Sequence, residues 1–219
     1  MPQIQFKNIP PKKSSDARDL EVLLSELHQM IPEFIESSIF NRDIFDKSDE
    51  NHYTETLIKY LENEKSDSRF SYKQQASLPN KRSTDIGVHL KADSEHYIFN
   101  IEAKFLPTND YVTREYAAIK RFKKLDHGLS NRNPNIAKLL PESAIVGYSH
   151  SGTFENHLAS INNLILKLSK STTLDKFGLS WHDTEQLRKI KIDKTAILVS
   201  DHPRHDNSSI RLHHFWVYV

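Results

Sequence analysis

Hydrophobic residues recur at helical spacing along the first part of the chain. Between residues 20 and 35 they stand three or four positions apart, which predicts an amphipathic helix that Pro32 kinks or ends. Residues 50–64, ENHYTETLIKYLENE, repeat this spacing and predict a second helix. Two helices are therefore expected ahead of the first strand.

A period of two then replaces the helical period. Residues 69–78 alternate apolar with polar side chains and predict a strand, which the loop PNKRS follows at 79–83. Residues 84–104, TDIGVHLKADSEHYIFNIEAK, predict two further strands joined by the polar turn KADSE. Three strands are therefore expected in succession.

Helices and strands alternate in the rest of the chain. Asn109 is placed to cap a helix over 110–128, which Gly128 would end. The segments after it predict a strand, an amphipathic helix and two more strands, at 143–150, 153–170, 194–200 and 210–219. The order helix, three strands, helix, strand, followed by additions, indicates a mixed α/β sheet flanked by helices.

One register of the two strands in 84–104 makes a face of the hairpin wholly apolar. It pairs Ile86 with Ile101, Val88 with Phe99 and Leu90 with Tyr97. A slip by one residue would turn this row outward, so the pattern specifies the register well.

The opposite face of the same hairpin is charged. The register places Asp85 directly opposite Glu102, with Lys104 two residues further along. Opposed Cβ atoms are about 5 Å apart, so the carboxylates would raise one another's pKa unless a cation offset them. Mg²⁺ is the natural candidate, because it prefers oxygen ligands from carboxylates, water and phosphate. The Lys104 ammonium could then hold or help deprotonate a water and stabilise phosphate charge, which points to phosphodiester hydrolysis.

The pattern Asp85 … Glu102-Ala103-Lys104 resembles the PD-(D/E)XK nuclease superfamily, which includes many restriction endonucleases. The core of that family is helix, three strands, helix, strand, which is the order predicted for residues 49–149. A lone D…ExK pattern also occurs by chance, and its other interpretation is a surface carboxylate, an edge-strand Glu and a solvated Lys.

The helix at 50–64 adds to the resemblance. Its first twelve residues look like the E-x-x-x-T-x-x-L-x-x-x-L form of the family's first core helix, whose Glu often joins the metal site. Helix phase places Glu50 on the side of the apolar stripe and points Glu55 away from it. The chain departs from the family pattern at Thr84, where many members have Pro before the Asp.

The resemblance implies one nuclease domain over 1–219 with a restriction endonuclease-like core. The core would span about 49–149, with an N-terminal helical extension at 1–45 and a C-terminal extension of helix and strands at 150–219. The implied activity is Mg²⁺-dependent endonucleolytic hydrolysis of DNA, with Mn²⁺ able to substitute, in a setting such as bacterial defence against foreign DNA. An RNA endonuclease of the same fold and a non-catalytic nucleic-acid-binding subunit remain alternatives.

The resemblance also assigns roles within the site. Asp85, Glu102 and the carbonyl of Ala103 would ligate the metal, Glu50 would complete or orient the site, and Lys104 would position the water. Because the charged face lies away from the apolar row, alanine at each of the three hairpin positions should abolish cleavage and leave folding nearly intact.

Two groups of cations are candidate contacts for DNA. Lys81 and Arg82 lie just before the predicted metal site, and Arg114 and Arg121 share one side of the predicted helix with Ala118. A commonplace cationic loop and a solvated amphipathic helix are the alternative interpretations.

Composition sets broad limits. The 219 residues suit one domain, and 37% hydrophobic with 27% charged residues is ordinary for a globular protein. A net charge of +1 gives no argument for nucleic acid, so that interpretation depends on local features. The chain has no cysteine, no segment resembling a signal peptide and no apolar run of about 18 residues, so we expect a cytoplasmic protein without membrane contact.

The remaining features concern partners and other metals. Four of the 12 histidines lie in the last twenty residues, but HPRH and HH have no spacing typical of a zinc site, and His213 and His214 should point to opposite faces of a strand. The sequence contains no helix-turn-helix, zinc finger or other reader of bases. Specificity is therefore expected to come from a homodimer or from a partner protein.

Overall fold

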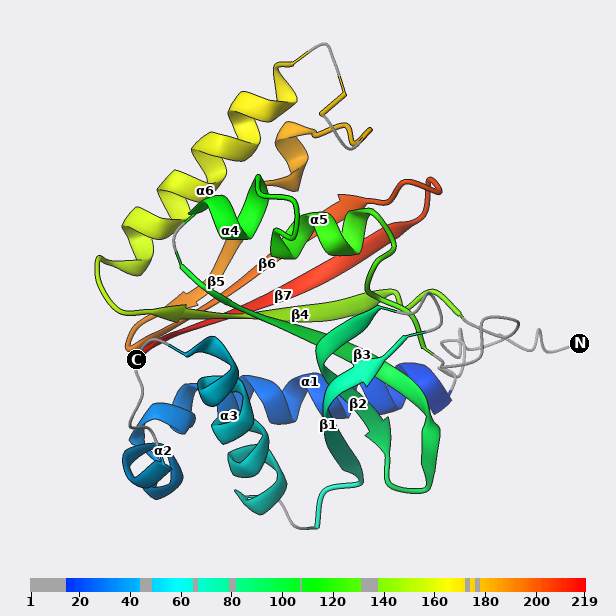
Figure 1. Cartoon of the computed structure of the whole chain (residues 1–219), viewed down its shortest axis with the longest axis vertical. Helices are drawn as coiled ribbons and strands as arrows, with labels where there is room; N and C mark the ends of the chain where they lie inside the picture. Colours follow the sequence, from blue (N-terminus) through cyan, green and yellow to red (C-terminus); the bar gives the residue numbers. More distant parts are fainter. Residues whose placement is uncertain are drawn as a thin grey trace, which may run out of the picture.

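A seven-stranded sheet lies between two layers of helices in the computed structural model (Figure 1). The structure describes residues 15–43, 49–64, 67–78, 82–106, 108–130, 138–171, 174–175 and 178–219. The strands are β1 (Phe70–Ser77), β2 (Ser83–Leu90), β3 (Asp93–Phe105), β4 (Glu142–Ser149), β5 (Arg188–Ile192), β6 (Thr195–Pro203) and β7 (Ser209–Tyr218).

The sheet is mixed, with the order β1-β2-β3-β4-β7-β6-β5. Strands β1, β2 and β3 are antiparallel, β3, β4 and β7 run parallel, and β6 and β5 continue antiparallel to the other edge. The predicted mixed α/β sheet is confirmed. The short edge strand β5 was not predicted, because the segment RKIKI is almost entirely exposed and needs no apolar alternation.

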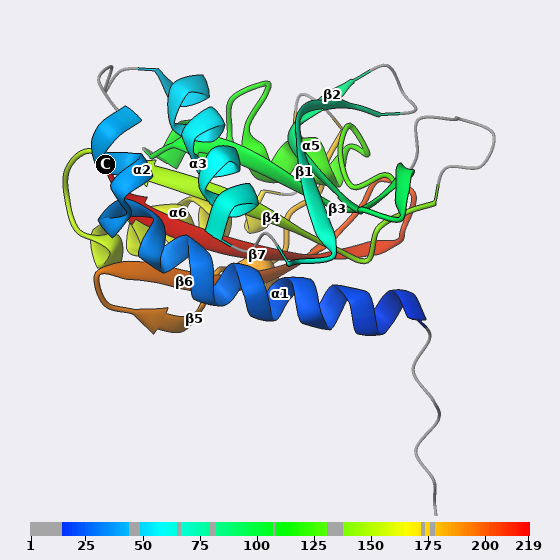
Figure 2. The ribbon, with the colours of Figure 1, turned by 90° about the horizontal axis from the view of Figure 1, so that it is seen from below.

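Each face of the sheet has its own helical layer, as Figure 2 shows from below. One layer contains α1 (Ser15–Glu33), the 3₁₀ helix η1 (Phe34–Glu36), α2 (Ser38–Asp43) and α3 (Glu50–Glu64). The other contains α4 (Thr108–Val112), α5 (Ala118–Lys123), α6 (Phe154–Ser169) and the 3₁₀ helix η2 (Asp183–Glu185). In the described ranges, no helix has the length and apolar character needed to span a bilayer.

The two helices expected from the first part of the chain are confirmed. Helix α3 has the predicted bounds, and α1 carries Pro32 in its last turn, after which the chain continues as a 3₁₀ turn. The residues of α3 that face the sheet include Thr54, Leu57 and Leu61, which are buried, whereas Glu55 is exposed. The helix phase was therefore correct.

The β2–β3 register agrees with the prediction over most of the hairpin. Ile86 pairs with Ile101 and Val88 with Phe99, and all four side chains are fully buried in the core between the sheet and helices α1 and α3. The apolar row therefore fixes the faces of both strands at the end where the charged residues lie.

The expected pairing of Leu90 with Tyr97 is wrong. Irregularities in the ladder pair His89 with Tyr97 instead. The shift turns the Tyr97 ring to the opposite face, where it packs so closely over Gly87 that a Cβ there would lie 2.7 Å from the ring. Ile98 instead of Tyr97 packs against the core between the sheet and helices α1 and α3. The Tyr97 ring fills the space that the glycine leaves on the other face.

The single helix expected over 110–128 is also wrong, since residues 113–117 separate α4 from α5. The buried apolar residues of these two helices are Tyr111, Val112, Ala118, Ile119 and Phe122. One continuous helix would place Glu115 in the middle of that row, whereas the break leaves it exposed. Asn109 lies inside α4 rather than at its cap, and Gly128, at φ +81°, lies beyond the end of α5.

Candidate active site

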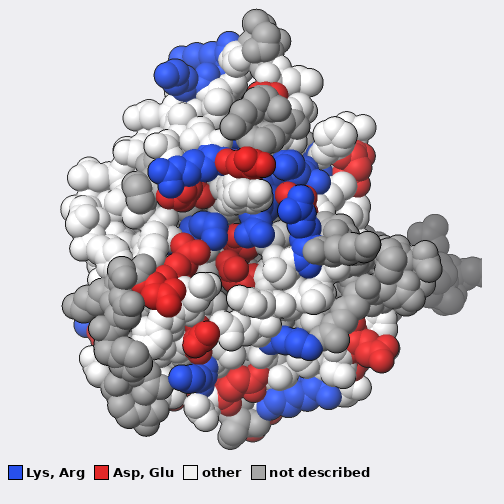
Figure 3. Space-filling model, in the orientation of Figure 1, with Lys and Arg blue, Asp and Glu red and all other residues white. Residues whose placement is uncertain are grey.

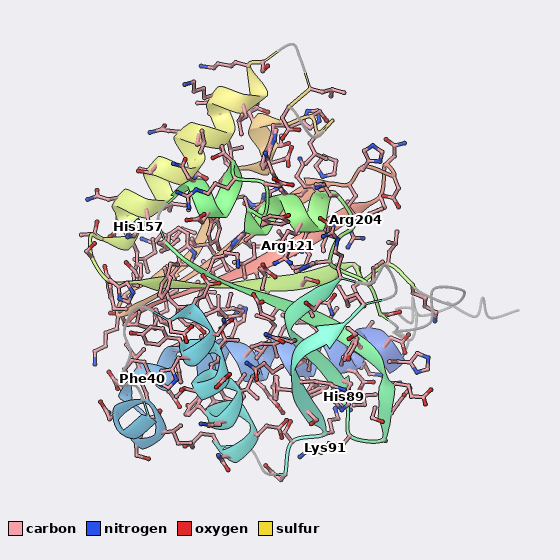
Figure 4. All side chains as sticks on the ribbon, viewed as in Figure 1. Phe40, His89, Lys91, Arg121, His157 and Arg204 are labelled. Carbon is pink, nitrogen blue, oxygen red and sulfur yellow. The ribbon has the colours of Figure 1, made fainter. Side chains whose placement is uncertain are left out.

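The four predicted catalytic side chains meet at one place, although they come from three separate elements. Glu50 begins α3, Asp85 lies on β2, and Glu102 and Lys104 lie on β3. Arg121 on α5 closes the group from the other helical layer, and Figure 4 shows it between α5 and the sheet. The site therefore lies where both helical layers meet strand β3.

Lys104 is the centre of this group. Its Nζ donates to Glu50 Oε1 at 3.0 Å and lies 3.2 Å from Glu102 Oε1. It also donates to the carbonyl of Ala103 at 2.8 Å, and Asp85 Oδ2 is 4.0 Å away. Burial alone would lower the pKa of Lys104, but the surrounding carboxylates raise it above its ordinary value. The side chain is therefore a fixed ammonium, which can hold a water or stabilise an anion but does not serve as a base.

Glu50 ties α3 to the end of β3. Its Oε2 accepts the backbone N–H of Phe105 at 2.8 Å, while its other oxygen binds Lys104. The preceding Asp49 accepts the Asn51 N–H and starts the helix, so Glu50 occupies the first turn, where the helix dipole favours an anion.

Asp85 is the least neutralised carboxylate of the group. Its Oδ2 accepts the Ala103 N–H at 2.8 Å, which holds the side chain against β3, and the 4.0 Å separation from Lys104 gives no hydrogen bond. Burial raises the pKa of Asp85 to about 7, and the neighbouring Glu102 carboxylate adds to this rise.

Glu102 lies in the opposite electrostatic environment. Its side chain is fully buried, forms an ion pair with Arg121, and has His127 Nδ1 at 3.0 Å, outside hydrogen-bond geometry. Burial alone would raise the pKa of Glu102, but His127, Lys104 and Arg121 hold it well below its ordinary value. Two neighbouring carboxylates are therefore shifted in opposite directions.

The approach of His127 was not predicted. Asn100, on the same face of β3 as Glu102, accepts the backbone N–H groups of Gly128 and Leu129 with its Oδ1, at 2.9 and 3.1 Å. Asn100 thus holds the segment that carries the histidine, and this places His127 beside Glu102. No local sequence pattern marks His127, because its position depends on how the chain returns to the sheet after α5.

The expectation that the three alanine substitutions leave folding nearly intact needs revision at Glu102. The sheet face that carries Glu102 points away from the core beside α1 and α3, as expected. However, α5 and residues 127–129 cover this face at Glu102. Removing the Glu102 carboxylate would leave Arg121 in a covered site without its anion, which is destabilising.

The predicted DNA contacts lie in different surroundings. Arg121 would have to leave Glu102 to reach a phosphate. Arg114, in the break between α4 and α5, donates from one guanidinium nitrogen to both carboxylate oxygens of Asp110, at 2.7 and 2.9 Å. The two arginines therefore do not share one side of a single helix. Arg82 is exposed and lies 3.8 Å from Asp126, and Lys81 lies outside the described residues.

An open pocket of about 510 Å³ adjoins the group. Its lining residues are Glu50, Lys104, Asp110, Arg114, Glu115 and Tyr116. One side of the candidate site is thus accessible to a ligand, whereas Glu102 on the other side is sealed.

Three oxygen donors of the group are the ligands assigned to the implied Mg²⁺. Asp85, Glu102 and the Ala103 carbonyl supply the hard oxygens that Mg²⁺ prefers, and the excess negative charge at Asp85 is of the kind that a cation relieves. Lys104 contacts the same carbonyl and Glu102, and among the described residues no three His, Cys, Asp or Glu side chains have metal-ligand geometry. The set fits Mg²⁺ in chemistry and charge, with Asp85 as the accessible ligand.

A second buried polar network lies above the sheet and was also missed. Its members, in order of contact, are Lys123, Glu185, His202, Ser200, His214 and Tyr111. Contacts from Glu185 to Tyr111 measure 2.6 to 2.7 Å, and burial lowers the pKa of both His202 and His214. On the other face of β7, His213 contacts Glu142, so the predicted opposite directions of the two adjacent histidines are confirmed.

Comparison of the chain with protein-family models, with curated proteins and with solved structures finds no match.

Proposed function

We propose that this protein is a metal-dependent endonuclease with a restriction endonuclease-like core, acting on phosphodiester bonds of DNA. The observation that supports the proposal most strongly is that Glu50, Asp85 and Glu102 surround the Lys104 ammonium within 4.0 Å. A surface carboxylate, an edge Glu and a solvated Lys would not converge from α3, β2 and β3. The succession α3, β1, β2, β3, α4–α5 and β4 also agrees with the helix, three strands, helix, strand order of that family.

Each residue of the candidate site then has a distinct role. Lys104 stays protonated and holds the attacking water or the charge that develops on phosphate oxygen. Glu50 fixes the Lys104 ammonium, and Arg121 fixes the buried Glu102. Asp85, Glu102 and the Ala103 carbonyl would hold Mg²⁺ or Mn²⁺, which supplies Lewis-acid activation of the phosphate and of water.

The charge balance supports a cation requirement. When Asp85 is ionised, three carboxylates lie beside the two cations Lys104 and Arg121, so the group carries an excess negative charge that repels a phosphate. A bound divalent cation makes the net charge of the group positive. Cleavage should therefore depend strictly on the divalent cation and should disappear in EDTA.

The decisive experiment is cleavage by purified protein with Mg²⁺ or Mn²⁺ on supercoiled plasmid, single-stranded DNA and RNA. Asp85→Ala and Lys104→Ala should abolish cleavage, and Glu55→Gln, on the exposed side of α3, should retain it. Equal cleavage by the parent and Asp85→Ala would show that the site is wrongly assigned. Cleavage of RNA alone would identify an RNA endonuclease, and binding without cleavage would identify a non-catalytic subunit.

We further propose that two chains act together or that a partner protein delivers the substrate. Cutting both strands of a duplex calls for two active centres, and the described part of the chain brings the predicted catalytic side chains into one cluster. The C-terminal strands β5, β6 and β7 complete the sheet, so they offer no separate base-reading module in the described ranges.

A further inference from the structure

The pocket beside Lys104 contains one aromatic side chain, which the proposed chemistry does not use. Tyr116 is 59% exposed and lies in the break between α4 and α5, at the rim that faces the candidate site. A single exposed aromatic residue is common on protein surfaces. This one is unusual in its position, since it shares a pocket with the two residues, Glu50 and Lys104, that form the open side of the site.

The segment that carries Tyr116 is held firmly by its neighbours. The Arg114 N–H donates to Asn109 O at 2.9 Å, and Ala117 N–H donates to Arg114 O at 3.1 Å. Lys120 Nζ donates to Thr113 O at 2.8 Å from the next helix. The adjacent Ala117 is fully buried and anchors the backbone. The ring is therefore presented from a fixed backbone, which lowers the entropic cost of stacking a ligand on it.

Charge around the pocket does not favour a duplex backbone. Both of its cations are paired, Lys104 with Glu50 and Arg114 with Asp110, and Glu115 adds an exposed carboxylate. Figure 3 shows Lys and Arg side chains over α4 and α5 with Asp and Glu side chains between them, rather than a continuous basic surface. Recognition at this rim should therefore depend more on stacking than on phosphate charge.

We propose that Tyr116 is a stacking platform for an unpaired nucleotide, so that the neighbouring site takes DNA that is unpaired at the point of cleavage, either a single strand or a duplex opened there. The face of a base is available for stacking only when the base is unpaired, since a duplex covers it with its neighbours. The pocket of about 510 Å³ has room for a base beside the phosphate at Lys104. This inference rests on the proposed function, because it takes Lys104 as the residue that contacts the scissile phosphate.

The test measures binding separately from cleavage. A fluorescein-labelled 20-mer of dT and a duplex of equal length are titrated with the full chain in Ca²⁺, which binds the same kind of oxygen ligands as Mg²⁺ and offsets the carboxylate charge, and anisotropy gives each Kd. Tyr116→Ala should weaken single-strand binding roughly tenfold, and Tyr116→Phe should stay near the parent, because stacking needs only the ring. Ile190→Ala, which removes an exposed side chain from the distant edge strand β5, is the matched control and should change nothing.

A 2-aminopurine base in the single strand provides a second readout, because stacking on the ring quenches its fluorescence. Quenching by the parent and by Tyr116→Phe, but not by Tyr116→Ala, is the expected result. Unchanged single-strand affinity in Tyr116→Ala, or tighter binding of the duplex than of the single strand, would overturn the inference. Tyr116-dependent binding without any cleavage in Mg²⁺ would support the single-strand site and reject the nuclease, so the two failures are distinguishable.

Discussion

Asp85 and Glu102 should respond in opposite ways to the loss of their charge. In the absence of metal at pH 8, Asp85→Asn should stabilise the protein, whereas Glu102→Gln should destabilise it. The Asp85 carboxylate has its nearest cation, Lys104, 4.0 Å away, and an asparagine oxygen can still accept the Ala103 N–H. Glu102 is fully buried against Arg121, which would lose its anion.

The sign for Asp85 follows from proton linkage. Its pKa rises from 3.8 to about 7 on folding, because burial and Glu102 disfavour the anion. The folded state therefore binds the proton more tightly, and stability falls as pH rises from about 4 to about 7. A rise of this size corresponds to about 4 kcal/mol, and solvent reaching a side chain that is 25% exposed reduces this to about 2 kcal/mol.

Glu102 has the reverse sign, because contact with His127, Lys104 and Arg121 lowers its pKa in the folded state. Its charge stabilises the fold at neutral pH, and this contribution is lost as the pH falls through the lowered pKa. Replacing it with Gln removes one partner of a buried ion pair, which costs about 3 kcal/mol.

Thermal unfolding in EDTA between pH 5 and pH 8 measures both effects. At this chain length about 1 kcal/mol shifts the Tm by roughly 2–4 °C, so Asp85→Asn should melt roughly 4–8 °C above the parent at pH 8. This difference in Tm should shrink towards pH 5, where Asp85 is protonated in the folded parent. Glu55→Gln is the control for losing a carboxylate from the exposed side of α3.

Two results would refute this reasoning. Asp85→Asn could melt at or below the parent at pH 8, which would mean that its charge is already compensated in the folded protein. Alternatively, the same Tm difference between Asp85→Asn and the parent at every pH would show that the asparagine acts through packing rather than through charge. Added Mg²⁺ should raise the Tm of the parent at pH 8 and leave Asp85→Asn nearly unchanged, because the substitution removes the accessible ligand.

Three other predictions test separate parts of the protein. Glu50→Gln should impair Mg²⁺-dependent cleavage by at least tenfold, on the order of losing one charged hydrogen bond to Lys104. Glu55→Gln should be nearly silent in the same assay. The reverse result would show that the other side of α3 faces the site. Lys123→Met should lower the free energy of unfolding in urea by about 3 kcal/mol, because it leaves the Glu185 carboxylate buried without its ammonium, and the exposed Lys189→Met should cost less than about 0.5 kcal/mol. Light scattering should give about twice 25.5 kDa, and a strict monomer that makes sequence-specific double-strand breaks without a partner would exclude both the dimer and the delivering protein.

Local patterns predicted the parts of the site that depend on one hairpin or one helix. Alternation along 84–104 fixed which face of the hairpin carries Asp85 and Glu102, and the apolar stripe of α3 selected Glu50 over Glu55. These inferences succeed because burial of an apolar row determines the direction of every other side chain on the same element.

Features that depend on contacts between distant segments could not be predicted in the same way. Tyr97 changes face because Gly87 on the neighbouring strand leaves room for its ring, and the helix over 110–128 breaks because burial of its apolar row would have buried Glu115. His127 reaches Glu102 only through the path of the chain after α5. For Tyr97 and His127 the deciding partner lies on another segment, whereas Glu115 lies within the predicted helix and decides the break only once the face that the sheet buries is known.

The two sides of the candidate site differ in what they can exchange with solvent, and this indicates where chemistry should occur. Arg121 and the nearby His127 seal Glu102 under α5, so that this carboxylate is a fixed charge whatever the pH near neutrality. Asp85 has no such partner, and its charge is the part of the group that responds to a proton or a cation. Under the proposed function, an incoming cation should therefore be held first at Asp85. Under the same proposal, a substrate would approach from the open pocket, on the side that carries Tyr116, and metal affinity should depend more on Asp85 than on the more deeply buried Glu102.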